Sequence, residues 1–460
     1  MEYPFTGKKM MHVSPLDAWI SAGIGQQPTH DLDLTLLREY QLRHLNRTLD
    51  HARTHSPFYR KRLQDRSGRP LKSLVELEGL PFTTSTDLCR EGLQMLAVSQ
   101  GAIDRVVTLE SSGTTGPAKR LYFTRDELAL TQAFFRCGMS QVLRPGHRAL
   151  VLLPGELPAS AGDLLARALE PLGVVCQVFG LVSDPCACAA LLAKEPFDCV
   201  VGIPVQVLSV LRHPHAASIP PGIIKSVFLT SDFVPDALVE EIGRRWGCPA
   251  FNHYGMTEMA LSGGVDCLAL AGYHLRELDL FFEIVNPATG ESLPPGRTGE
   301  VVVTTLTRTG MPLIRYRTDD LSRFITEPCP CGSALPRLGK LRGRRTRLVD
   351  LGAGQWLGMP ELDEELFVVP GLINYLAALT TEEGVNTLAL TIEAAAGTEQ
   401  DTLADIRRRL PIIPQIETAL AEGALRLRPV TLCQEPLPVS STAKRTIEDH
   451  GKERSIPCAI

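Results

Sequence analysis

The chain has 460 residues, of which 44% are hydrophobic and 22% are charged, and its formal net charge is -5. This composition is typical of an ordinary soluble globular protein, and the length predicts two or three domains. The small negative charge gives no overall attraction toward nucleic acid or an anionic membrane surface. We therefore expect neither nucleic acid nor a membrane as a partner.

The N-terminal segment and the cysteines indicate the compartment. Residues 1–15 contain no apolar core of signal-peptide length, and no window approaches the roughly 18 uninterrupted apolar residues that a membrane span needs. The 12 cysteines are scattered along the chain without a dense disulfide framework. Together these features predict a protein of the reducing cytoplasm, in which some cysteines can serve as metal ligands.

The first hundred residues are mainly helical in pattern, with an amphipathic helix expected over 36–52. From about residue 149, short apolar strands alternate with helices. The expected strands are 149–153, 174–179, 198–203, 225–229 and 250–254, and the expected helices are 161–169, 188–194 and 236–246. This alternation predicts a mostly parallel sheet with right-handed crossovers, whose ligands bind at the carboxyl ends of the strands.

Beyond residue 273 the pattern becomes β-rich, with strand-like segments at 280–285, 287–299 and 300–306 and a connection rich in Gly and Pro. Near residue 343 a small α+β unit begins, with strands expected at 374–379, 387–392 and 425–430 and a helix at 401–410. The predicted fold class is α/β. A large N-terminal domain (1–342) contains mostly parallel sheets and a β-rich subdomain, and a small mobile α+β domain follows (343–460).

A loop rich in glycine and hydroxyl groups lies between the extended segments 105–109 and 121–123. Residues 111–119 (Ser-Ser-Gly-Thr-Thr-Gly-Pro-Ala-Lys) hold two glycines, four hydroxyls and one lysine. Glycine lets backbone N–H groups turn toward an anion, hydroxyls donate further hydrogen bonds, and lysine adds a point charge. The spacing differs from the G-x-x-x-x-G-K-[ST] loop. A phosphate-binding loop is the functional interpretation, and a polar turn is the alternative.

Two further segments carry groups suited to a nucleotide. Asn252-His253-Tyr254-Gly255-Met256-Thr257-Glu258 ends an apolar strand and supplies an aromatic ring, a glycine turn, a hydroxyl and a carboxylate for Mg²⁺. In 313–321 (Leu-Ile-Arg-Tyr-Arg-Thr-Asp-Asp-Leu), an aspartate after a strand can accept hydrogen bonds from two ribose hydroxyls. Taken singly, the first segment is also compatible with an ordinary strand end and the second with a solvated charged turn.

Taken in order, these three motifs closely resemble the adenylate-forming enzyme superfamily, specifically its phenylacetate–CoA ligase branch. Segments 56–60 (Ser-Pro-Phe-Tyr-Arg) and 80–88 (Leu-Pro-Phe-Thr-Thr-Ser-Thr-Asp-Leu) are similar to N-terminal signatures of that branch. The resemblance covers about residues 40–450. It implies an AMP-forming carboxylate–CoA ligase that uses ATP, Mg²⁺ and coenzyme A on an aromatic or other small organic acid, with a homodimer as one option.

The implied reaction has two steps. A carboxylate oxygen attacks the α-phosphate of ATP and releases pyrophosphate, and the thiolate of coenzyme A then attacks the acyl-adenylate. Two other functions stay open, namely an adenylating enzyme with a different acceptor and a non-catalytic nucleotide-binding relative. Against the second stands the presence of Lys119, Glu258, Asp320 and Lys444.

The resemblance also implies the site residues. The nucleotide-binding set would be Ser111, Ser112, Gly113, Thr114, Thr115, Gly116, Lys119, Asn252, His253, Tyr254, Gly255, Met256, Thr257, Asp320 and Arg344. In it the loop holds the phosphates, Tyr254 lies against adenine and Asp320 binds ribose. The catalytic set would be Lys444, Thr115 and Glu258, with Glu258 on Mg²⁺ and Lys444 bridging the carboxylate and the α-phosphate.

The chain departs from the family pattern in two places. The hinge usually carries an aspartate, and here it reads Arg345-Thr346-Arg347-Leu348. The acid pocket would be formed by Ser231, Asp232, Tyr254 and Gly255, where relatives usually have a Gly-Ala or Gly-Gly turn before glutamate. An unpaired buried Asp232 would be costly. We therefore expect either a polar substituent on the acid or a partner arginine.

Four residues suggest a separate metal centre. Cys267, His274, Cys329 and Cys331 can complete a closed tetrahedral Zn²⁺ shell, which is the arrangement of a structural site. Similar positions occur in relatives of this branch, some of which bind zinc. Four unrelated buried side chains are the alternative. Cys186-Ala187-Cys188 is a rival pair, but it is interpreted as the start of a helix with no histidine nearby, and core packing is expected there.

Overall fold

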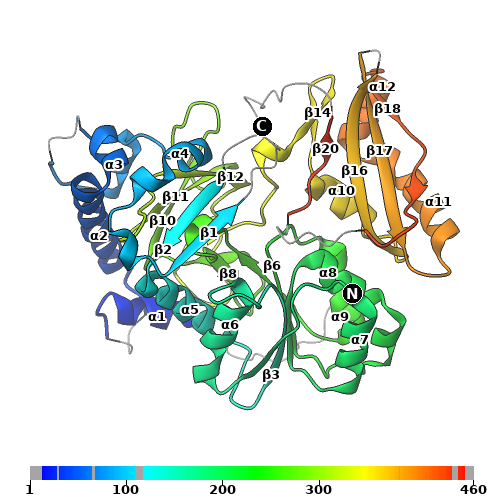
Figure 1. Cartoon of the computed structure of the whole chain (residues 1–460), viewed down its shortest axis with the longest axis horizontal. Coiled ribbons are helices and arrows are strands. Elements are labelled where there is room, and N and C mark those ends of the chain that lie inside the picture. The colour runs from blue at the N-terminus through cyan, green and yellow to red at the C-terminus, as the bar shows by residue number, and fades with distance from the viewer. Residues whose placement is uncertain are drawn as a thin grey trace.

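An eight-stranded sheet crosses the centre of the chain in the computed structural model, which describes residues 13–27, 31–64, 68–109, 118–382, 384–437 and 444–450 (Figure 1). Its strands, in spatial order, are β13 (Arg337–Leu338), β9 (Tyr273–Leu275), β8 (Gly264–Asp266), β7 (Ala250–Tyr254), β6 (Ser226–Thr230), β5 (Cys199–Gly202), β3 (Arg148–Leu152) and β4 (Val175–Val178). Strands β4, β3, β5, β6 and β7 are parallel. The predicted α/β class is confirmed, and β8, β9 and β13 extend the sheet in antiparallel pairing that was not predicted.

Helices cover both faces of this sheet. They are α1 (Pro15–Gly23), α5 (Arg125–Met139) and α6 (Ala161–Leu169) on one face, and α7 (Pro185–Lys194), α8 (Pro204–Arg212) and α9 (Asp236–Trp246) on the other (Figure 1). Side chains of a strand alternate between its faces. Accordingly Val151 packs with α5 and α6, whereas Leu150 and Leu152 pack with α7 and α8. The prediction missed α8, because its short run Pro-Val-Gln-Val-Leu-Ser-Val-Leu-Arg is mostly apolar and rich in valine, which does not distinguish a helix from a buried strand.

Helices and two small sheets lie beside the central sheet. The helices are α2 (Leu34–His55), α3 (Pro57–Arg62) and α4 (Ser85–Glu91), the first sheet is the hairpin of β1 (Arg105–Leu109) and β2 (Lys119–Phe123), and the second is formed by β10 (Leu280–Val285), β11 (Gly299–Thr305) and β12 (Tyr316–Ser322). The expected strand at 287–299 is wrong. Most of that segment is a connection, held by the Asn286 side chain, which accepts hydrogen bonds from the amides of Ala288 and Thr289.

The C-terminal part contains a five-stranded sheet with helices on it. Its elements are β14 (Val349–Gly352), β15 (Gln355–Leu357), α10 (Met359–Leu366), β16 (Leu372–Glu382), β17 (Val385–Ala394), α11 (Glu399–Arg409), α12 (Pro414–Ala421), β18 (Leu425–Leu427), β19 (Thr431–Leu432) and β20 (Glu448–Asp449). The expected strands and helix all fall within or overlap these elements, whereas α12 was not predicted. The domain boundary at 342–343 stays a prediction.

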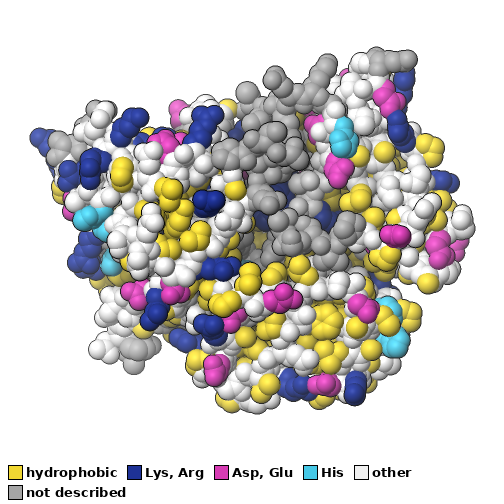
Figure 2. All heavy atoms as spheres, in the orientation of Figure 1, with side chains coloured by type: hydrophobic (Ala, Val, Ile, Leu, Met, Phe, Trp, Pro, Cys, Tyr) yellow, Lys and Arg dark blue, Asp and Glu magenta, His cyan; other side chains and the backbone are white. Residues whose placement is uncertain are grey.

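The surface of the described chain shows no single sign of charge. On the face in Figure 2, basic and acidic side chains are interspersed, in keeping with the small net charge. None of the helices in the described ranges combines the length and the apolar character needed to cross a membrane.

A buried arginine joins α8 to the C-terminal part. Arg212 forms a salt bridge with Glu241 at 2.6 Å, with both side chains at most 3% exposed. The same guanidinium donates hydrogen bonds to the backbone carbonyls of Phe367, Val369 and Leu372. Because an isolated buried charge is costly, this dense set of partners fixes α8 against the segment between α10 and β16.

Arg212→Met is expected to lower the free energy of unfolding by about 3–5 kcal/mol, because it leaves the three carbonyls without their buried donor and Glu241 with only the part-exposed Arg245 as a cation. Urea unfolding monitored by circular dichroism measures the change. Arg408→Met, which removes an exposed pair with Asp405, is the matched control and should change stability by less than about 1 kcal/mol. Equal effects of the two substitutions would contradict a structural role for the buried pair.

Candidate active site

A cavity of about 2210 Å³ opens where the parallel strands β3, β5, β6 and β7 end, and the hairpin β1–β2, strand β12 and the C-terminal segment at 444–448 close around it. The predicted site residues that line it are Lys119, Ser231, His253, Gly255, Met256, Thr257, Glu258, Arg344 and Lys444. Asn252, Tyr254, Asp232 and Asp320 lie outside the lining in the described chain. Ser111, Ser112, Gly113, Thr114, Thr115 and Gly116 fall outside the described residues.

Glu258 is a buried carboxylate held by two donors. Its side chain is 3% exposed, and its Oε1 forms a salt bridge with Lys119 and accepts a hydrogen bond from the Tyr316 hydroxyl at 2.8 Å. Burial raises the pKa of Glu258, but the charges of Lys119 and Arg344 outweigh it, so the pKa lies below its ordinary value. Glu258 is therefore ionised near neutral pH, as a ligand for a hard cation must be.

Asp320 is the second buried carboxylate. Its Oδ2 accepts a hydrogen bond from the Tyr254 hydroxyl at 3.0 Å, and its Oδ1 accepts one from Arg344 Nε at 2.7 Å. Burial raises the pKa of Asp320, but the charges of Arg344 and Lys444 bring it below its ordinary value. Tyr254 is only 2% exposed, so its hydroxyl anchors the aspartate while its ring lies behind the cavity wall.

Position 255 is a glycine because the surrounding backbone leaves no room for a side chain there. A Cβ at this position would clash with the carbonyl group of Leu261, and backbone cannot move aside as a flexible side chain can. The glycine thus brings the 261 loop against the end of β7. This close approach places Met256, Thr257 and Glu258 at the cavity.

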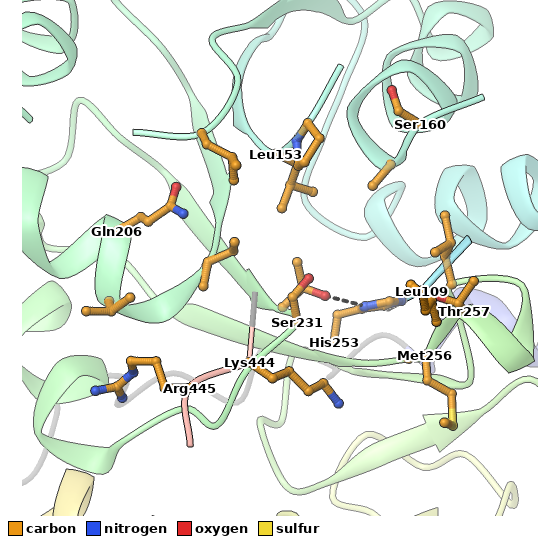
Figure 3. A pocket seen from close by; sticks show the side chains of 18 of the residues that line it. Leu109, Leu153, Ser160, Gln206, Ser231, His253, Met256, Thr257, Lys444 and Arg445 are labelled. Carbon is orange, nitrogen blue, oxygen red and sulfur yellow. Dashed lines mark hydrogen bonds between the residues drawn. The ribbon is translucent and has the colours of Figure 1, made fainter. Parts of the chain in front are cut away.

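Lys444 enters the cavity from the C-terminal segment, and its neighbour Arg445 fixes it there. In Figure 3 the Lys444 side chain extends toward Met256, whereas Arg445 points in the opposite direction. Burial and the charge of Arg344 lower the pKa of Lys444 to about 8, although Asp320 acts in the other direction. The lysine therefore keeps its positive charge in most molecules at neutral pH.

Arg445 is the charge partner of Asp232. Its guanidinium lies 3.6 Å from Asp232 Oδ2 and 2.5 Å from Asp363 Oδ2, and its backbone N–H donates to Asp232 at 3.4 Å. Of the two expected solutions, the partner arginine is thus present, and Asp232 lies outside the cavity lining. Sequence reasoning missed Arg445, because its partners lie 82 and 213 residues away.

The inner part of the cavity is mostly apolar. Its walls include Phe134, Phe135, Met139, Leu153, Val201 and Phe228. One polar pair interrupts them, where Thr230 Oγ1 and His253 Nδ1 lie 2.9 Å apart (Figure 3). Burial and the charge of Arg276 lower the pKa of His253 to about 4, so this ring is neutral at physiological pH.

The altered hinge segment forms a short 3₁₀ helix, Arg345–Arg347. Arg345 forms a salt bridge with Asp319 at 3.2 Å, and Arg347 donates to the Lys444 carbonyl at 3.3 Å. The segment thus contacts both β12 and the C-terminal lysine. Whether it serves as a hinge stays a prediction.

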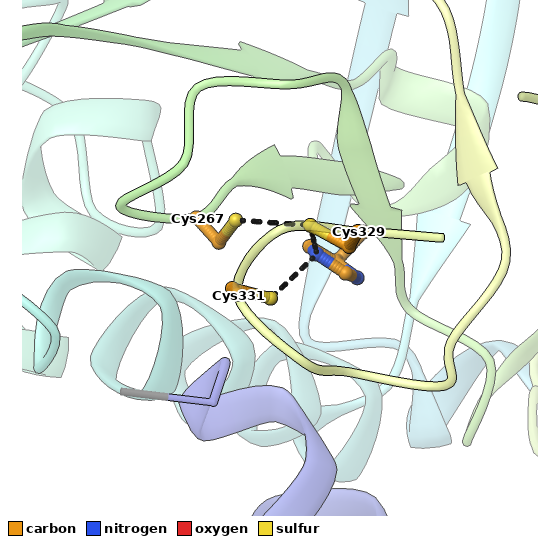
Figure 4. Close-up of side chains that lie close together, drawn as sticks. Cys267, Cys329 and Cys331 are labelled. Atoms are coloured by element: carbon orange, nitrogen blue, oxygen red, sulfur yellow. Dashed lines mark hydrogen bonds between the residues drawn. The ribbon is translucent and has the colours of Figure 1, made fainter. Parts of the chain in front are cut away.

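The four predicted zinc ligands lie together in the structure (Figure 4). Cys267 and Cys329 have their sulfur atoms 3.6 Å apart, and His274 Nε2 lies 3.3 Å from Cys329 Sγ and 3.5 Å from Cys331 Sγ. All four side chains belong to buried residues. They connect β8 and β9 to the loop that precedes β13, at the antiparallel end of the central sheet.

The interpretation of the rival cysteine pair needs one correction. Cys188 is buried in the core, as expected. Cys186, however, is exposed, and His213 and His215 bring their ring nitrogens within 4.8 Å of its sulfur atom and of one another. The statement that no histidine lies nearby is therefore wrong, because α8 returns the chain to the start of α7.

Comparisons with known proteins show the family to which the chain belongs. The AMP-binding enzyme family matches residues 71–307. The phenylacetate-coenzyme A ligase of Aromatoleum evansii is 30% identical over 380 residues, which are 78% of this chain and 81% of that ligase. The corresponding ligase of Thermus thermophilus is 28% identical over 363 residues, covering 76% and 79%. The crystal structure of 2-hydroxyisobutyryl-CoA ligase in the postadenylation state shares the fold, with a TM-score of 0.75 at 20% identity over 90% of both chains.

Arg344→Met is expected to destabilise the fold by about 3 kcal/mol at neutral pH, because Asp320 loses its nearest cation. Burial then raises the pKa of Asp320 above its unfolded value, so the deficit should shrink as pH falls to about 5 and the carboxyl becomes neutral. Thermal unfolding at the two pH values measures this. The double variant Arg344→Met/Asp320→Asn should recover most of the loss, and a deficit independent of pH in the single variant would contradict the pairing.

Proposed function

Because the chain belongs to the AMP-binding enzyme family, we propose that it is an AMP-forming carboxylate–CoA ligase that acts on an aromatic or other small organic acid. The observation that carries this proposal is the shared cavity. Lys119 and Glu258, from separate strand ends of the large part, and Lys444, from the C-terminal segment, all line it. An apolar inner pocket adjoins these charged groups.

The first half-reaction brings two anions together. A carboxylate oxygen of the acid attacks the α-phosphorus of ATP, the bond to the bridging oxygen breaks, and pyrophosphate leaves. Lys444 would lie between the carboxylate and the α-phosphate and stabilise the negative charge that develops on the transferring phosphoryl group. Its position beside Asp320 and Arg344, at the edge of the pocket, supports this role.

Lys119 and Glu258 would separate when the nucleotide binds. In the structure they neutralise one another, with Lys119 also 3.4 Å from the Ser85 hydroxyl. Glu258, ionised and buried, fits the need of Mg²⁺ for a carboxylate oxygen, and the ion would supply charge neutralisation of the phosphates. Lys119 would then turn to the phosphates together with the loop that begins at Ser111.

The Asp320 carboxylate would accept hydrogen bonds from the ribose hydroxyls. A carboxylate offers about four lone-pair positions, and Tyr254 and Arg344 occupy two of them in the structure. These two donors hold the carboxylate in one orientation and leave acceptor capacity for a sugar. We propose that Tyr254 lies near the adenine, where its ring would form part of the wall behind the site.

The second half-reaction would transfer the acyl group to coenzyme A. The thiolate attacks the carbonyl carbon of the acyl-adenylate, the bond to the phosphate oxygen breaks, and AMP leaves with the electron pair. We propose that residues 343–460 act as a lid that carries Lys444 into the site for adenylation. The contacts of Arg345 and Arg347 with Asp319 and with the Lys444 carbonyl are consistent with a joint in this segment.

The apolar inner pocket favours an acid with a flat or compact apolar body. Its phenylalanine side chains offer faces for ring packing. Because Asp232 is paired with Arg445, its charge does not require a polar substituent on the acid. Ser231 and the neutral pair of Thr230 and His253 are among the polar groups of the cavity lining.

We further propose that Cys267, His274, Cys329 and Cys331 hold a structural Zn²⁺. With Zn–S bonds of about 2.3 Å, tetrahedral geometry places two sulfur atoms about 3.8 Å apart, close to the 3.6 Å between Cys267 and Cys329. Burial raises the pKa of both thiols, so they stay protonated unless a cation replaces the protons. Four protein ligands leave no open position for chemistry.

Acid-dependent exchange of labelled pyrophosphate into ATP, without coenzyme A, tests the first half-reaction across a panel of acids. Lys444→Ala should lower exchange about 100-fold or more, while thiolysis of a supplied acyl-adenylate continues. Exchange should also fall as pH rises through about 8, because Lys444 then loses its proton. Lys194→Ala, at an exposed site in α7, is the control.

Each outcome of this experiment has a separate meaning. Exchange without any acyl-CoA product would indicate another acceptor, and no exchange with any acid would contradict catalysis. Equal loss of exchange and thiolysis in Lys444→Ala would contradict the assigned step.

Zinc should copurify at close to one equivalent after dialysis against a weak chelator, because the buried, fully coordinated site exchanges slowly. Cys329→Ser should lower the zinc content and the midpoint of thermal unfolding, because the buried site then has three ligands and either binds zinc incompletely or loses it. Elemental analysis and calorimetry measure both. Cys188→Ala, a buried cysteine outside the cluster, should keep the zinc. Metal-free protein of undiminished stability would overturn the site.

A further inference from the structure

We propose that the corner between α7 and the end of α8 binds a second, exchangeable divalent transition-metal ion through Cys186, His213 and His215. One ligand atom of each side chain lies within 4.8 Å of the other two. This inference is independent of the proposed enzymatic function. It concerns a face of α7 and α8 that is remote in sequence from the cluster at Cys267.

Local interactions fix the ligands without any metal. Asp184 caps α7, where its Oδ1 accepts a hydrogen bond from the Ala187 amide at 3.0 Å, and this places Cys186 in the first turn. Cys188, two positions later, points into the core and is fully buried. The helix α7 is thus held in one rotation, with Cys186 outward.

The histidines are fixed from the other side. Arg212, the last residue of α8, is anchored by Glu241, and His213 follows it directly and caps the short helix Pro214–Ser218. The rings of His213 and His215 have centroids 5.1 Å apart and planes 30° apart. Their convergence on Cys186 therefore follows from the packing of α7 against this helix end and needs no rearrangement of the backbone.

The donor set determines which ion fits. One thiolate and two imidazoles suit borderline ions such as Zn²⁺, Co²⁺ and Ni²⁺, whereas Mg²⁺ and Ca²⁺ prefer oxygen ligands. Cys186 and His215 are exposed and His213 is half-buried, so an ion reaches the site directly from solvent. Three protein ligands leave a fourth position to water. Such a site exchanges its metal more readily than the closed, buried cluster.

Binding requires one small change. The His215 amide donates a hydrogen bond to His213 Nδ1 at 3.2 Å. A metal on Nδ1 would take the place of this donor, and a metal on Nε2 would leave the proton on Nδ1, so either mode ends the bond. His215 lies at an exposed turn, where water can accept the hydrogen bond of its amide instead.

A bound ion would brace the joint between α8 and the C-terminal part. His213 is the immediate neighbour of Arg212, whose guanidinium holds the carbonyls of Phe367 and Val369. On the other side of the site, Asp184 and Pro185 line the large cavity. The ion would thus link the start of α7 at the cavity to the end of α8.

Untagged full-length protein, treated with a weak chelator and then titrated with Co²⁺, tests the proposal. We expect one rapidly binding equivalent with a thiolate-to-cobalt charge-transfer band. Cys186→Ser should remove the band, and His215→Ala should weaken binding at least about tenfold. Cys433→Ser and His147→Ala, at other cysteine and histidine positions, should leave both unchanged.

Because Cys186 and His215 are exposed, we expect both variants to fold as the wild-type chain does, and thermal unfolding of each variant checks this. Absence of a rapidly binding equivalent in the wild-type chain would overturn the proposal. Retention of the band in Cys186→Ser would overturn it equally. A change in the slowly exchanging zinc of the buried cluster would instead assign the signal to Cys267, Cys329 and Cys331.

Discussion

The arrangement of side chains at the cavity depends on one constraint, namely that charges buried away from water must be paired. Glu258 and Asp320 are each 2% exposed, and burial by itself raises the pKa of both carboxyls. Lys119 and Arg344 keep them ionised. Two tyrosine hydroxyls complete the arrangement: Tyr254 donates to Asp320 and Tyr316 donates to Glu258, and these hydrogen bonds join the end of β7 to β12. The same contacts that stabilise the fold therefore keep both carboxylates ionised, as the proposed binding of a cation and of a ribose requires.

Lys444 and Arg445, adjacent in the C-terminal segment, have different roles. Arg445 is bound to Asp232 of the β6–α9 connection and to Asp363 of α10, which secures the C-terminal segment. Lys444, next to it, is left to face the cavity, where burial lowers its pKa to about 8. Substituting Arg445 would thus disturb the position of Lys444 without touching the reacting groups. A structural ion pair and the charge that we propose to be catalytic are thus carried by adjacent residues.

Local patterns predicted the parts of the fold that local physics controls. The helices α6 and α9 and the strand β7 follow from periodicity, and Glu258 was found because glycine and a carboxylate follow an apolar strand. The pairing of Arg445 with Asp232 was left open, since a charge 213 residues away gives no local signal. The helix α8 was missed because its short run is mostly apolar and rich in valine, which does not distinguish a helix from a buried strand. The two histidines that follow it, close to Cys186, were missed with it.

The two groups of cysteine and histidine residues differ in ways that fix their expected behaviour. The cluster at Cys267 supplies four buried ligands across strands and loops that are distant in sequence, so an ion there would be part of the fold. The corner at Cys186 supplies three ligands, two of them exposed, on helices already fixed by Asp184 and Arg212. Removal of its ion would leave the backbone in place. Ligand number and burial therefore distinguish the proposed structural metal from the proposed exchangeable one.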